Sequence, residues 1–554
     1  MLKMNKSKSY GLGIDTGGTY TDAVILDLST RKVVKSAKTP STHADLGMGI
    51  GNVLKALFTD LALHPSEITT IAVSTTLATN AVIENMGARV ALFVIGPVKH
   101  FDLPAVSVSH IEGGHNYLGE EEKNIDIEML YDRVLYVKDN VDAYAVTAAM
   151  SIKNPAHEKV AKKALEMLDP NKPVFCSYHA STLPGIQERA ATTVLNARLL
   201  PTMQSFLQGV DSTLTDLSVT NDLVVIRGDA QPMDLQKAVN HAADTFASGP
   251  AASICYGSSF SQTADAVIVD VGGTTTDISI IRNNYPVIST DGCQIGKWQT
   301  HVNAVDMYTV GCGGDSLISF KENRIEVGPK RVMPVSMVPE VPDSFNFACD
   351  DILHTYLVLN EKSPCQFDDS DPLITALRQK GGASFIDLKE ELNLTEFGLE
   401  QKINDFFKND LILQVGFTPT DALHALGQMN FGNHEVAAYA AQNLAKQFNL
   451  TSDQFCEAVI DAAAQKIEEA ILAHVIRREL GLSMSDFLVK SKNHRFLSID
   501  FSLKLPIIAI GAAAKKLLPA VGERLNTEVI FPDHYEVGNA IGALLIALEN
   551  KKQL

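Results

Sequence analysis

Two short stretches of the chain combine aspartate, paired glycines and threonines in the same order. GIDTGGTYTDAVILD covers residues 13–27, and IVDVGGTTTDISII covers residues 268–281. Paired glycines permit positive φ angles and leave no Cβ between the main chain and a ligand. The N–H groups of such a turn, flanked by threonine hydroxyls, form a concave site that suits a phosphate group. Both stretches therefore predict phosphate-binding turns.

Each stretch places an aspartate just before its glycines, at Asp15 and at Asp270. A carboxylate would repel a phosphate unless both bound a divalent cation, and Mg²⁺ favours a few carboxylates together with phosphate oxygens. We therefore expect Asp15 and Asp270 to be catalytic residues that bind magnesium, directly or through water. We expect the turn residues to contact the phosphates, namely Thr16, Gly17, Gly18, Thr19, Gly272, Gly273, Thr274 and Thr275. A tight hairpin with an Asx-type turn explains a single copy equally well.

The two stretches are related by a constant spacing. Six residues of the first stretch recur 255 residues later: Asp15, Gly17, Gly18, Thr19, Thr21 and Asp22 recur as Asp270, Gly272, Gly273, Thr274, Thr276 and Asp277. Six identities at one offset indicate an internal repeat. The sequence thus predicts two similar halves, whose phosphate-binding turns face each other across one cleft.

The elements that must position these turns can be read from the hydrophobic pattern. In each copy an apolar run enters the turn and another leaves it, which is typical of a β-hairpin. After the first hairpin we expect a strand at 32–40, a helix near 44–61, a strand at 69–76, a helix at 77–87 and a strand at 89–96. After the second we expect a strand at 285–290, a long excursion, and a final strand, helix, strand and helix within 505–548. Each half is predicted as a βββαβαβ unit with insertions.

The bulk properties are those of an ordinary soluble protein with several domains. A chain of 554 residues is longer than one hydrophobic core supports. Its formal net charge of -18 opposes general binding to nucleic acid or to anionic lipid. Seven cysteines without a CxxC pair indicate reduced thiols and a cytoplasmic location. No stretch looks like a signal peptide or reaches the roughly 18 apolar residues of a membrane span.

The paired hairpins and the order of strands and helices resemble the actin, sugar kinase and Hsp70 superfamily of ATP-dependent proteins. The resemblance implies an α/β fold class with duplicated ribonuclease H-like (actin-like ATPase) domains around a nucleotide cleft, and ATP and Mg²⁺ as cofactors. The stretch AIGAAAKKLLPAVGERL at 509–525 resembles the adenosine motif of that superfamily, with Gly511 close to the nucleoside. A strand, a loop and a helix that starts with small residues is an equally good interpretation of this stretch.

Six further stretches occur in a fixed order. They are STTLATNAVIENMGARVALFVIGP at 74–97, NPAHEKVAKKAL at 154–165, STLPGIQERAATTVLNARLLP at 181–201, RGDAQPMDLQKA at 227–238, SGPAAS at 248–253 and TPTDALHALG at 418–427. Together they resemble the hydantoinase/oxoprolinase family, which includes hydantoin utilization protein A, 5-oxoprolinase and the acetone carboxylase β subunit. The resemblance implies an ATP- and Mg²⁺-dependent hydrolase that activates a cyclic amide or a small carbonyl compound by phosphorylation.

The resemblance also suggests residues for the substrate side of the site, namely Asn80, Arg189, Asn196, Ser248 and Gly249. Each of them has a structural interpretation as well. Asn80 follows threonines that can cap a helix, and Arg189 and Asn196 fit a helix face with one buried asparagine. Ser248 and Gly249 precede Pro250 at the expected first position of a helix, where free N–H groups suit an anion. The sequence alone leaves both interpretations open.

The stretch after the second hairpin, VDMYTVGCGGDSLISF at 305–320, departs from the family pattern. Many members have a histidine where Tyr308 stands and a third glycine where Asp315 stands, and these changes leave the inherited substrate and reaction open. We expect Gly313 and Gly314 to belong to the nucleotide site. Cys312 could serve as a nucleophile, although a small side chain in a tight glycine loop explains it better.

The domain organisation follows from these elements. We predict a first half at 1–98, an inserted α/β region at 99–220, the start of the second half at 221–330, an insertion at 331–415, a helical segment at 416–505 and the end of the second half at 506–554. Within the insertion, helices and a strand at 370–413 look like a winged helix. Its third helix carries at least as many acidic as basic residues, so DNA is a poor partner. We interpret it as a protein-interaction or lid element.

Three functions fit these observations. The first is the ATP-dependent hydrolase, acting on a small molecule and associating with a second copy or with a second hydantoinase-type subunit. The second is a small-molecule kinase, which needs an acceptor-side aspartate that no local motif identifies. The third is a nucleotide-switched binding or assembly protein that uses the insertion for a partner. The fold alone does not choose among them.

Overall fold

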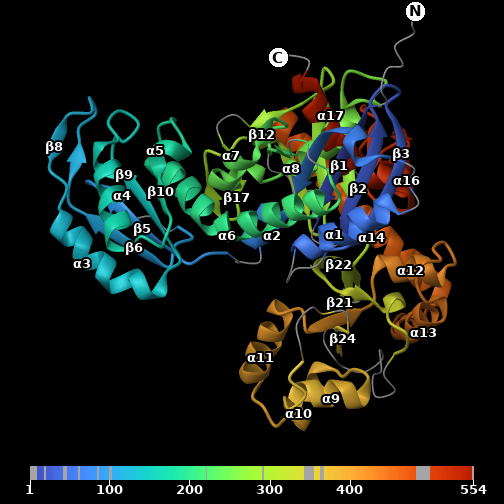
Figure 1. Cartoon of the computed structure of the whole chain (residues 1–554). Coiled ribbons are helices and arrows are strands. Elements are labelled where there is room, and N and C mark those ends of the chain that lie inside the picture. The colour runs from blue at the N-terminus through green and yellow to red at the C-terminus, as the bar shows by residue number, and fades with distance from the viewer. Residues whose placement is uncertain are drawn as a thin grey trace, which may run out of the picture.

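We describe the protein from a computed structural model (Figure 1). The structure describes residues 9–551 apart from 18–19, 42–45, 60, 62, 84–86, 99–102, 220, 222, 290–291, 323, 342–354, 362, 364–366 and 482–499. Within these residues, no helix is both long and apolar enough to cross a membrane.

The first sheet contains the first hairpin. Its six strands lie in the order β12-β11-β4-β1-β2-β3. Strands β1 and β2 are antiparallel, as predicted, and β4 runs parallel to β1. The strands are β1 (Tyr10–Thr16), β2 (Tyr20–Asp27), β3 (Lys32–Pro40), β4 (Ile68–Thr75), β11 (Leu223–Ile226) and β12 (Pro232–Asp234). Helices α1 (Leu46–Phe58) and α2 (Leu77–Ile83) follow β3 and β4.

The second sheet repeats this arrangement. Its main path is β15-β14-β13-β26-β27, and β20 also pairs with β14. Strands β13 and β14 form the second hairpin, and β26 runs parallel to β13 as β4 does to β1. The strands are β13 (Ala266–Val271), β14 (Thr276–Arg282), β15 (Tyr285–Pro286), β20 (Met307–Val310), β26 (Ile507–Ile510) and β27 (Val529–Ile530). Together with β26 and β27, helices α16 (Ala514–Arg524) and α17 (Gly538–Lys551) confirm the strand, helix, strand and helix predicted within 505–548.

Helices fill the space between the two sheets and cover their outer faces. One core joins Val24 and Ala72 of the first sheet to Ile268 and Ile508 of the second through α17 and α8 (Ser248–Ser258). A second core packs α1 and part of α6 (Ile186–Asp216) on the outer face of the first sheet. A third core packs α14 (Ser452–Leu480) and α16 on the outer face of the second. Helices α8 and α17 therefore link the two halves.

The strand predicted at 89–96 forms, but its predicted place in the first sheet is wrong. Strand β5 (Val90–Ile95) belongs to a separate parallel sheet of order β10-β9-β5-β6. In the first sheet, the neighbour of β4 on the side away from β1 is β11, which comes more than 100 residues later in the chain. VALFVI is apolar throughout, and such a run suits a buried strand with parallel neighbours in either sheet.

The separate sheet is the core of an inserted α/β unit, at the left of Figure 1. Its other strands are β6 (Ser107–Ile111), β9 (Ala143–Ala148) and β10 (Val174–Cys176), and its helices are α3 (Ile127–Val137), α4 (Ala156–Leu168) and α5 (Ser177–Ala180). Strands β7 (Gly114–His115) and β8 (Glu121–Lys123) form a small ribbon. The first half of α6 packs on this unit and the second half on the first sheet, so one helix joins the two.

The insertion and the helical segment follow the second hairpin. Helices α9 (Pro372–Lys380), α10 (Phe385–Glu391) and α11 (Glu396–Lys408) form a core of their own with β24 (Thr355–Leu359) and β25 (Ile412–Gly416). This is the predicted order of helices and strand within 370–413. Strands β23 (Met333–Pro334), β25 and β24 form a three-stranded sheet. Helices α12 (Pro419–Ala425), α13 (His434–Ala445) and α14 make up the helical segment.

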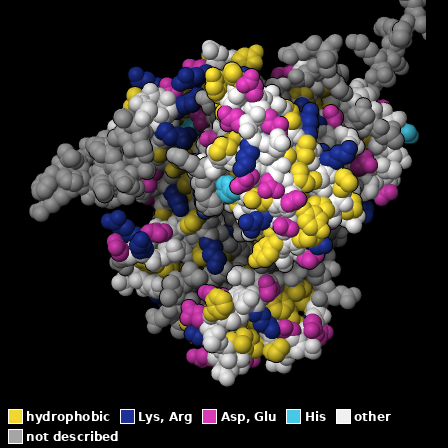
Figure 2. All heavy atoms as spheres, turned by 90° about the vertical axis from the view of Figure 1, so that its left-hand side faces the viewer, with side chains coloured by type: hydrophobic (Ala, Val, Ile, Leu, Met, Phe, Trp, Pro, Cys, Tyr) yellow, Lys and Arg dark blue, Asp and Glu magenta, His cyan; other side chains and the backbone are white. Residues whose placement is uncertain are grey.

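Charged side chains of both signs are interspersed on the face shown in Figure 2. Hydrophobic side chains lie among them. The described part of this face shows no broad area of a single sign.

Candidate functional site

Each hairpin ends in a tight turn closed by one backbone hydrogen bond. Gly17 N donates to Tyr20 O at 3.0 Å, and Gly272 N donates to Thr275 O at 2.9 Å. In the second turn, Gly273 N and Thr274 N make no hydrogen bond with any described residue. These two N–H groups are therefore available to an anion. In the first turn, Gly18 and Thr19 lie outside the described residues.

Asp15 lies at the end of β1 and is 3% exposed. Ser74, its neighbour on β4, donates a hydrogen bond of 2.6 Å to Asp15 Oδ1. Burial raises the pKa of Asp15 from 3.8 to about 7, and the charges of Asp22 and Asp270 act in the same direction. Next to it, the buried Thr16 hydroxyl has no hydrogen-bond partner among the described residues.

Asp270 occupies the same place at the end of β13. Ser253 of α8 donates a hydrogen bond of 2.6 Å to Asp270 Oδ2. Burial raises the pKa of Asp270, while the hydrogen bonds from Ser253 and Asn539 lower it. Gly511 lies directly alongside with a φ of +92°, and a Cβ there would come within 2.6 Å of Asp270 Oδ1 and 2.3 Å of Val271 O. The predicted glycine thus packs directly against the second carboxylate, where there is no room for a side chain.

Asn539, the second residue of α17, connects the two carboxylates. Its Nδ2 donates to Asp15 Oδ2 at 3.3 Å, and its Oδ1 lies against the Ser253 hydroxyl that holds Asp270. The two predicted aspartates are therefore brought together through one amide and one hydroxyl. The sequence analysis did not single out Ser74, Ser253 or Asn539. Ser74 and Ser253 lie at the ends of two of the ordered stretches, which was the available signal.

In each hairpin, the second aspartate lies directly opposite the first one, on the neighbouring strand. Asp22 lies opposite Asp15, and Lys38 of β3 forms an ion pair of 2.9 Å with it. Burial raises the pKa of Asp22, and Lys38 opposes that effect. Asp277 lies opposite Asp270 and accepts a hydrogen bond of 2.6 Å from the Thr309 hydroxyl. Burial raises the pKa of Asp277 to about 7.

The glycine loop at 311–315 packs against the second turn. Gly314 N donates to Gly272 O at 3.0 Å, and Asp315 N donates to Gly273 O at 2.7 Å. A Cβ on Gly313 would come within 2.6 Å of both of those carbonyl oxygens, which explains the glycine. The structure thus brings Gly313 and Gly314 into contact with the hairpin.

Two other residues of this stretch serve packing. Cys312 is fully buried, and burial raises the pKa of its thiol to about 11, which suits the small packing residue better than the nucleophile. Tyr308 packs toward α14, with its ring 6.3 Å from that of His474 and Arg477 over its face. Its neighbour Thr309 carries the bond to Asp277, so Tyr308 points away from that carboxylate.

The residues suggested for the substrate side lie in three places. Ser248 exchanges hydrogen bonds with the peptide of Thr75, and Gly249 lies against Asp15, whose Oδ1 would be 3.5 Å from a Cβ there. Pro250 is the third residue of α8, not the first as expected, because the helix already begins at Ser248. Asn80 lies on α2, and its side chain is outside the described residues.

Arg189 and Asn196 lie on α6. Arg189 is 2% exposed and donates to Ala148 O and Ser151 Oγ, both at 3.3 Å. Asn196 Oδ1 accepts a hydrogen bond of 2.8 Å from Ala243 N. None of these contacts involves a residue of either hairpin.

The aspartates at the hairpins could bind Mg²⁺ only if other oxygen ligands completed its coordination shell. Among the described residues, no group of three or more His, Cys, Asp or Glu side chains is arranged to hold a metal ion. Carboxylate oxygens nevertheless suit Mg²⁺, which keeps several waters and phosphate oxygens in its shell. Asp15 also carries the repulsion of Asp22 and Asp270, which a cation would relieve.

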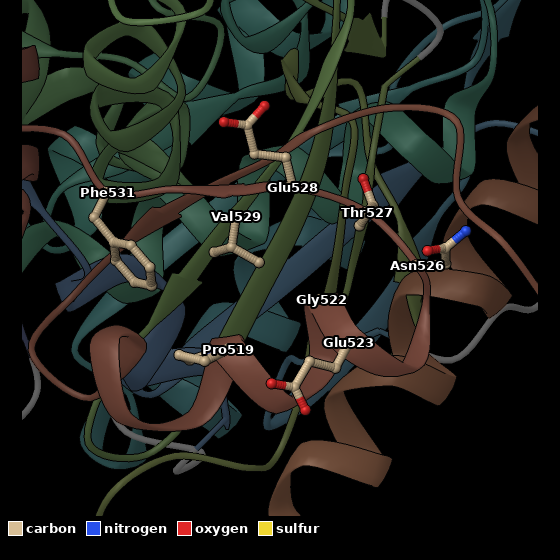
Figure 3. Close-up of a pocket in the computed structure, with 8 residues that line it drawn as sticks. All are labelled: Pro519, Gly522, Glu523, Asn526, Thr527, Glu528, Val529 and Phe531. Carbon is tan, nitrogen blue, oxygen red and sulfur yellow. The ribbon is translucent and has the colours of Figure 1, made fainter.

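A surface pocket of about 490 Å³ lies at the other end of α16 (Figure 3). Pro519, Glu523 and Asn526 line one side of it, and Glu528, Val529 and Phe531 line the other. None of the described residues of either hairpin borders this pocket, so it is separate from the candidate site as described.

Two family models together match most of the chain. The hydantoinase/oxoprolinase N-terminal region matches residues 11–168, and the hydantoinase/oxoprolinase model matches residues 189–552. The chain belongs to the hydantoinase/oxoprolinase family. This confirms the resemblance seen in the ordered stretches.

Relatives within the hydantoinase/oxoprolinase family are similar over part of their length. Caprolactamase subunit alpha of Pseudomonas jessenii is 28% identical over 361 residues, which cover 58% of this chain and 51% of that protein. 5-Oxoprolinase 1 of Arabidopsis thaliana is 28% identical over 378 residues, covering 58% of this chain and 29% of that protein. The chain thus spans about half, or less, of the curated relatives that it matches.

Solved structures show that the fold is shared. Nucleotide-free acetone carboxylase superimposes with a TM-score of 0.67 at 18% identity, covering 97% of this chain and 70% of that one. The ATP-dependent caprolactamase from Pseudomonas jessenii superimposes with a TM-score of 0.61 at 20% identity and the same coverage.

Proposed function

We propose that this member of the hydantoinase/oxoprolinase family is an ATP- and Mg²⁺-dependent hydrolase of cyclic amides or small carbonyl compounds. The observation that carries the proposal is the pair of buried carboxylates, Asp15 and Asp270, at the ends of two equivalent strands and linked through Asn539 and Ser253. Relatives described as an ATP-dependent caprolactamase and as a 5-oxoprolinase support the cyclic amide.

We interpret the two halves as duplicated ribonuclease H-like (actin-like ATPase) domains. Equivalent pairing supports this, since each half has an antiparallel hairpin followed by a parallel strand beside its first strand. In this interpretation the nucleotide lies between the hairpins. Gly273 N, Thr274 N and the Thr16 hydroxyl would bind the phosphates, and Gly511, which directly follows β26, would lie close to the nucleoside.

Asp15 and Asp270 would hold magnesium, directly or through water. The ion, when bound, would neutralise charge that develops on the phosphates. The chain's own task is positioning, because the hairpin N–H groups fix the transferred group and the buried setting strengthens each electrostatic contact. An amide carbonyl is a poor electrophile, and phosphorylation of its oxygen would turn that oxygen into a good leaving group.

A nucleotide-switched binding protein is the second candidate function. One observation favours it, namely the direct connection between the glycine loop and the insertion. Thr420 N, at the start of α12, donates to Gly314 O at 2.9 Å, and Asp421 accepts from Val335 N and Ser336 N. Strand β25 of the insertion leads straight into α12. The predicted winged helix would then act as a lid or a partner-binding element, and the relatives named as subunits support an assembly with other chains.

Magnesium-dependent ATP hydrolysis with and without hydantoin, 5-oxoproline, ε-caprolactam and small ketones tests the proposal. We expect one compound to stimulate phosphate release and to be hydrolysed in step with it. Asp270→Ala is expected to lose the stimulated rate while it keeps the wild-type circular dichroism. Tight ATP binding without stimulation by any compound would instead favour the switched binding protein.

A further inference from the structure

A row of charged side chains crosses the first sheet at the level of Asp15. Asp22 lies directly opposite Asp15 on β2, and Lys38 lies directly opposite Asp22 on β3. Residues that lie opposite each other in an antiparallel pair point to the same face of a sheet. Asp15 faces α17, since Asn539 Nδ2 donates to its Oδ2 at 3.3 Å. The three charged side chains therefore share the face that α17 and α8 link to the second half.

The ammonium of Lys38 lies close to the turn of the first hairpin. Its Nζ is 2.9 Å from Asp22 Oδ1 and 3.0 Å from Asp22 Oδ2. It also lies over the ring of Tyr20, 5.2 Å from the ring centroid. Tyr20 closes the turn, because its carbonyl oxygen accepts the hydrogen bond from Gly17 N. The ammonium is thus flanked by the carboxylate of Asp22 and by the side chain of the residue that ends the turn.

The end of β3 is itself attached to the same turn. Ser41, three residues after Lys38, donates a hydrogen bond of 2.8 Å from its hydroxyl to Gly17 O. The same hydroxyl lies 3.0 Å from the hydroxyl of Thr21. The strand that carries Lys38 could not move away from the turn without breaking these contacts, so the position of the lysine relative to the turn is fixed.

Lys38 has donors to spare, and the second half has no equivalent cation. An ammonium carries three N–H donors, and the only hydrogen bond of Lys38 Nζ to a described residue goes to Asp22. The lysine side chain is 33% exposed, so the other donors can reach a ligand. In the second half the corresponding neighbour of Asp277 is Thr309, whose hydroxyl is neutral and bonds to that aspartate. Of the two rows, only the first can therefore offer a positive charge to an anion.

We propose that Lys38 binds the γ-phosphate of ATP, and that Asp22 is a positioning residue that holds the ammonium beside the turn. The inference rests on the proposed function, in which the nucleotide lies between the hairpins. Gly511, expected close to the nucleoside, belongs to the second half, whereas Lys38 belongs to the first. The terminal phosphate is the part of ATP farthest from the nucleoside, so it is the part that Lys38 meets. One donor stays on Asp22 while the others bind phosphate oxygens, which suit a compact ammonium.

The test compares the binding of ADP with that of a non-hydrolysable ATP analogue, each with Mg²⁺, by calorimetry. We expect wild type to bind the analogue more tightly than ADP. Lys38→Met should bind the analogue about 10- to 100-fold more weakly, the usual size of one hydrogen bond to a charged group, and ADP with nearly unchanged affinity. Lys38→Arg keeps the charge and should recover part of the preference. Lys35→Met is the matched control, since Lys35 lies on the opposite face of the same strand and donates to Thr59 O.

Asp22→Asn separates a phosphate contact from the mere loss of an ion pair. This variant also breaks the pair but keeps the ammonium, so it should lose less of the preference for the analogue than Lys38→Met does. Circular dichroism first establishes that each variant is folded. Equal losses in these two variants, or a Lys38→Met variant with the wild-type preference, would overturn the inference and leave the proposed function intact. Failure of wild type to bind either nucleotide would overturn the proposed function and the inference together.

Discussion

The two hairpins carry the same aspartates but hold them with different neighbours. Asp15 lies opposite Ser74 on the parallel strand, and Ser74 donates to it directly. The equivalent neighbour of Asp270 is Ile510, which has no polar group, and the hydroxyl comes instead from Ser253 on α8. The first half thus provides the hydroxyl from its own sheet, whereas in the second half the hydroxyl comes from a helix packed between the sheets.

The comparison extends to the flanking strands. Lys38 is the neighbour of Asp22 on the third strand of the first half, whereas Thr309 is the neighbour of Asp277 in the second. One residue further along the parallel strands, the first half has Thr75 and the second continues into Gly511. The first hairpin therefore has a cation beside its second aspartate, and the second hairpin has a glycine packed against its first aspartate.

The largest effect is expected from removing the aspartate that both hairpins share. Asp15→Ala and Asp270→Ala should each lower magnesium-dependent ATP turnover by about 100-fold or more, the size seen when one preorganised electrostatic group is removed. Asp142→Asn, in a surface ion pair with Arg89, should leave turnover unchanged. A phosphate-release assay on the three variants gives the answer. Loss of turnover in only one aspartate variant would mean that the two halves do not share the metal.

The next effect concerns the close approach of Gly511 to the second hairpin. Gly511→Ala should destabilise the protein by about 3 kcal/mol, because a Cβ would overlap Val271 O and the backbone would remain at positive φ. Gly481→Ala is the control, since its φ is +66° with nothing within 4 Å, and should cost only about 1 kcal/mol. Urea unfolding of both variants measures the difference. Equal losses in the two variants would contradict the close approach.

A smaller effect on stability is expected from replacing Lys38 or Thr309, which contact the second aspartate of each hairpin. Lys38→Met should destabilise the protein by about 1 kcal/mol at pH 8, because Asp22 loses its cation while the lysine is partly exposed to solvent. Thr309→Val should cost about 1 kcal/mol through one lost hydrogen bond. Only the Lys38→Met effect should shrink in 1 M salt, although partial burial limits the screening. Equal salt dependence would show that the two hairpins are neutralised alike.

The last effect is a change in the pH dependence of stability. The pKa of Asp277 is about 7 in the folded protein and near 3.8 when unfolded, so the folded state binds more protons between these values. Stability should therefore fall as pH rises from about 4 to 7 without nucleotide. Asp277→Asn should reduce this slope. Thermal unfolding of both proteins at pH 5 and pH 8 tests this, and an unchanged slope would mean that Asp277 titrates normally.

The sequence predicted the parts of the site that depend on local order. The repeat located both hairpins and both aspartates, since a turn with two glycines is encoded within a few residues. The repeat could not identify the hydrogen-bond partners of the aspartates, because Asn539 lies 524 residues from Asp15 and comes from a helix of the other half. The strand at 89–96 was assigned to the wrong sheet for a related reason. An apolar run identifies a buried strand but does not say which parallel neighbour it has.

The measurement that tests the central claim most directly is the stoichiometry of nucleotide binding. Titration of the protein with a non-hydrolysable ATP analogue and Mg²⁺ in a calorimeter should give one site per chain if, as proposed, both hairpins bind the same nucleotide. Both Asp15→Ala and Asp270→Ala should abolish the magnesium dependence of that binding. Two independent sites per chain, or wild-type binding in either variant, would contradict the account.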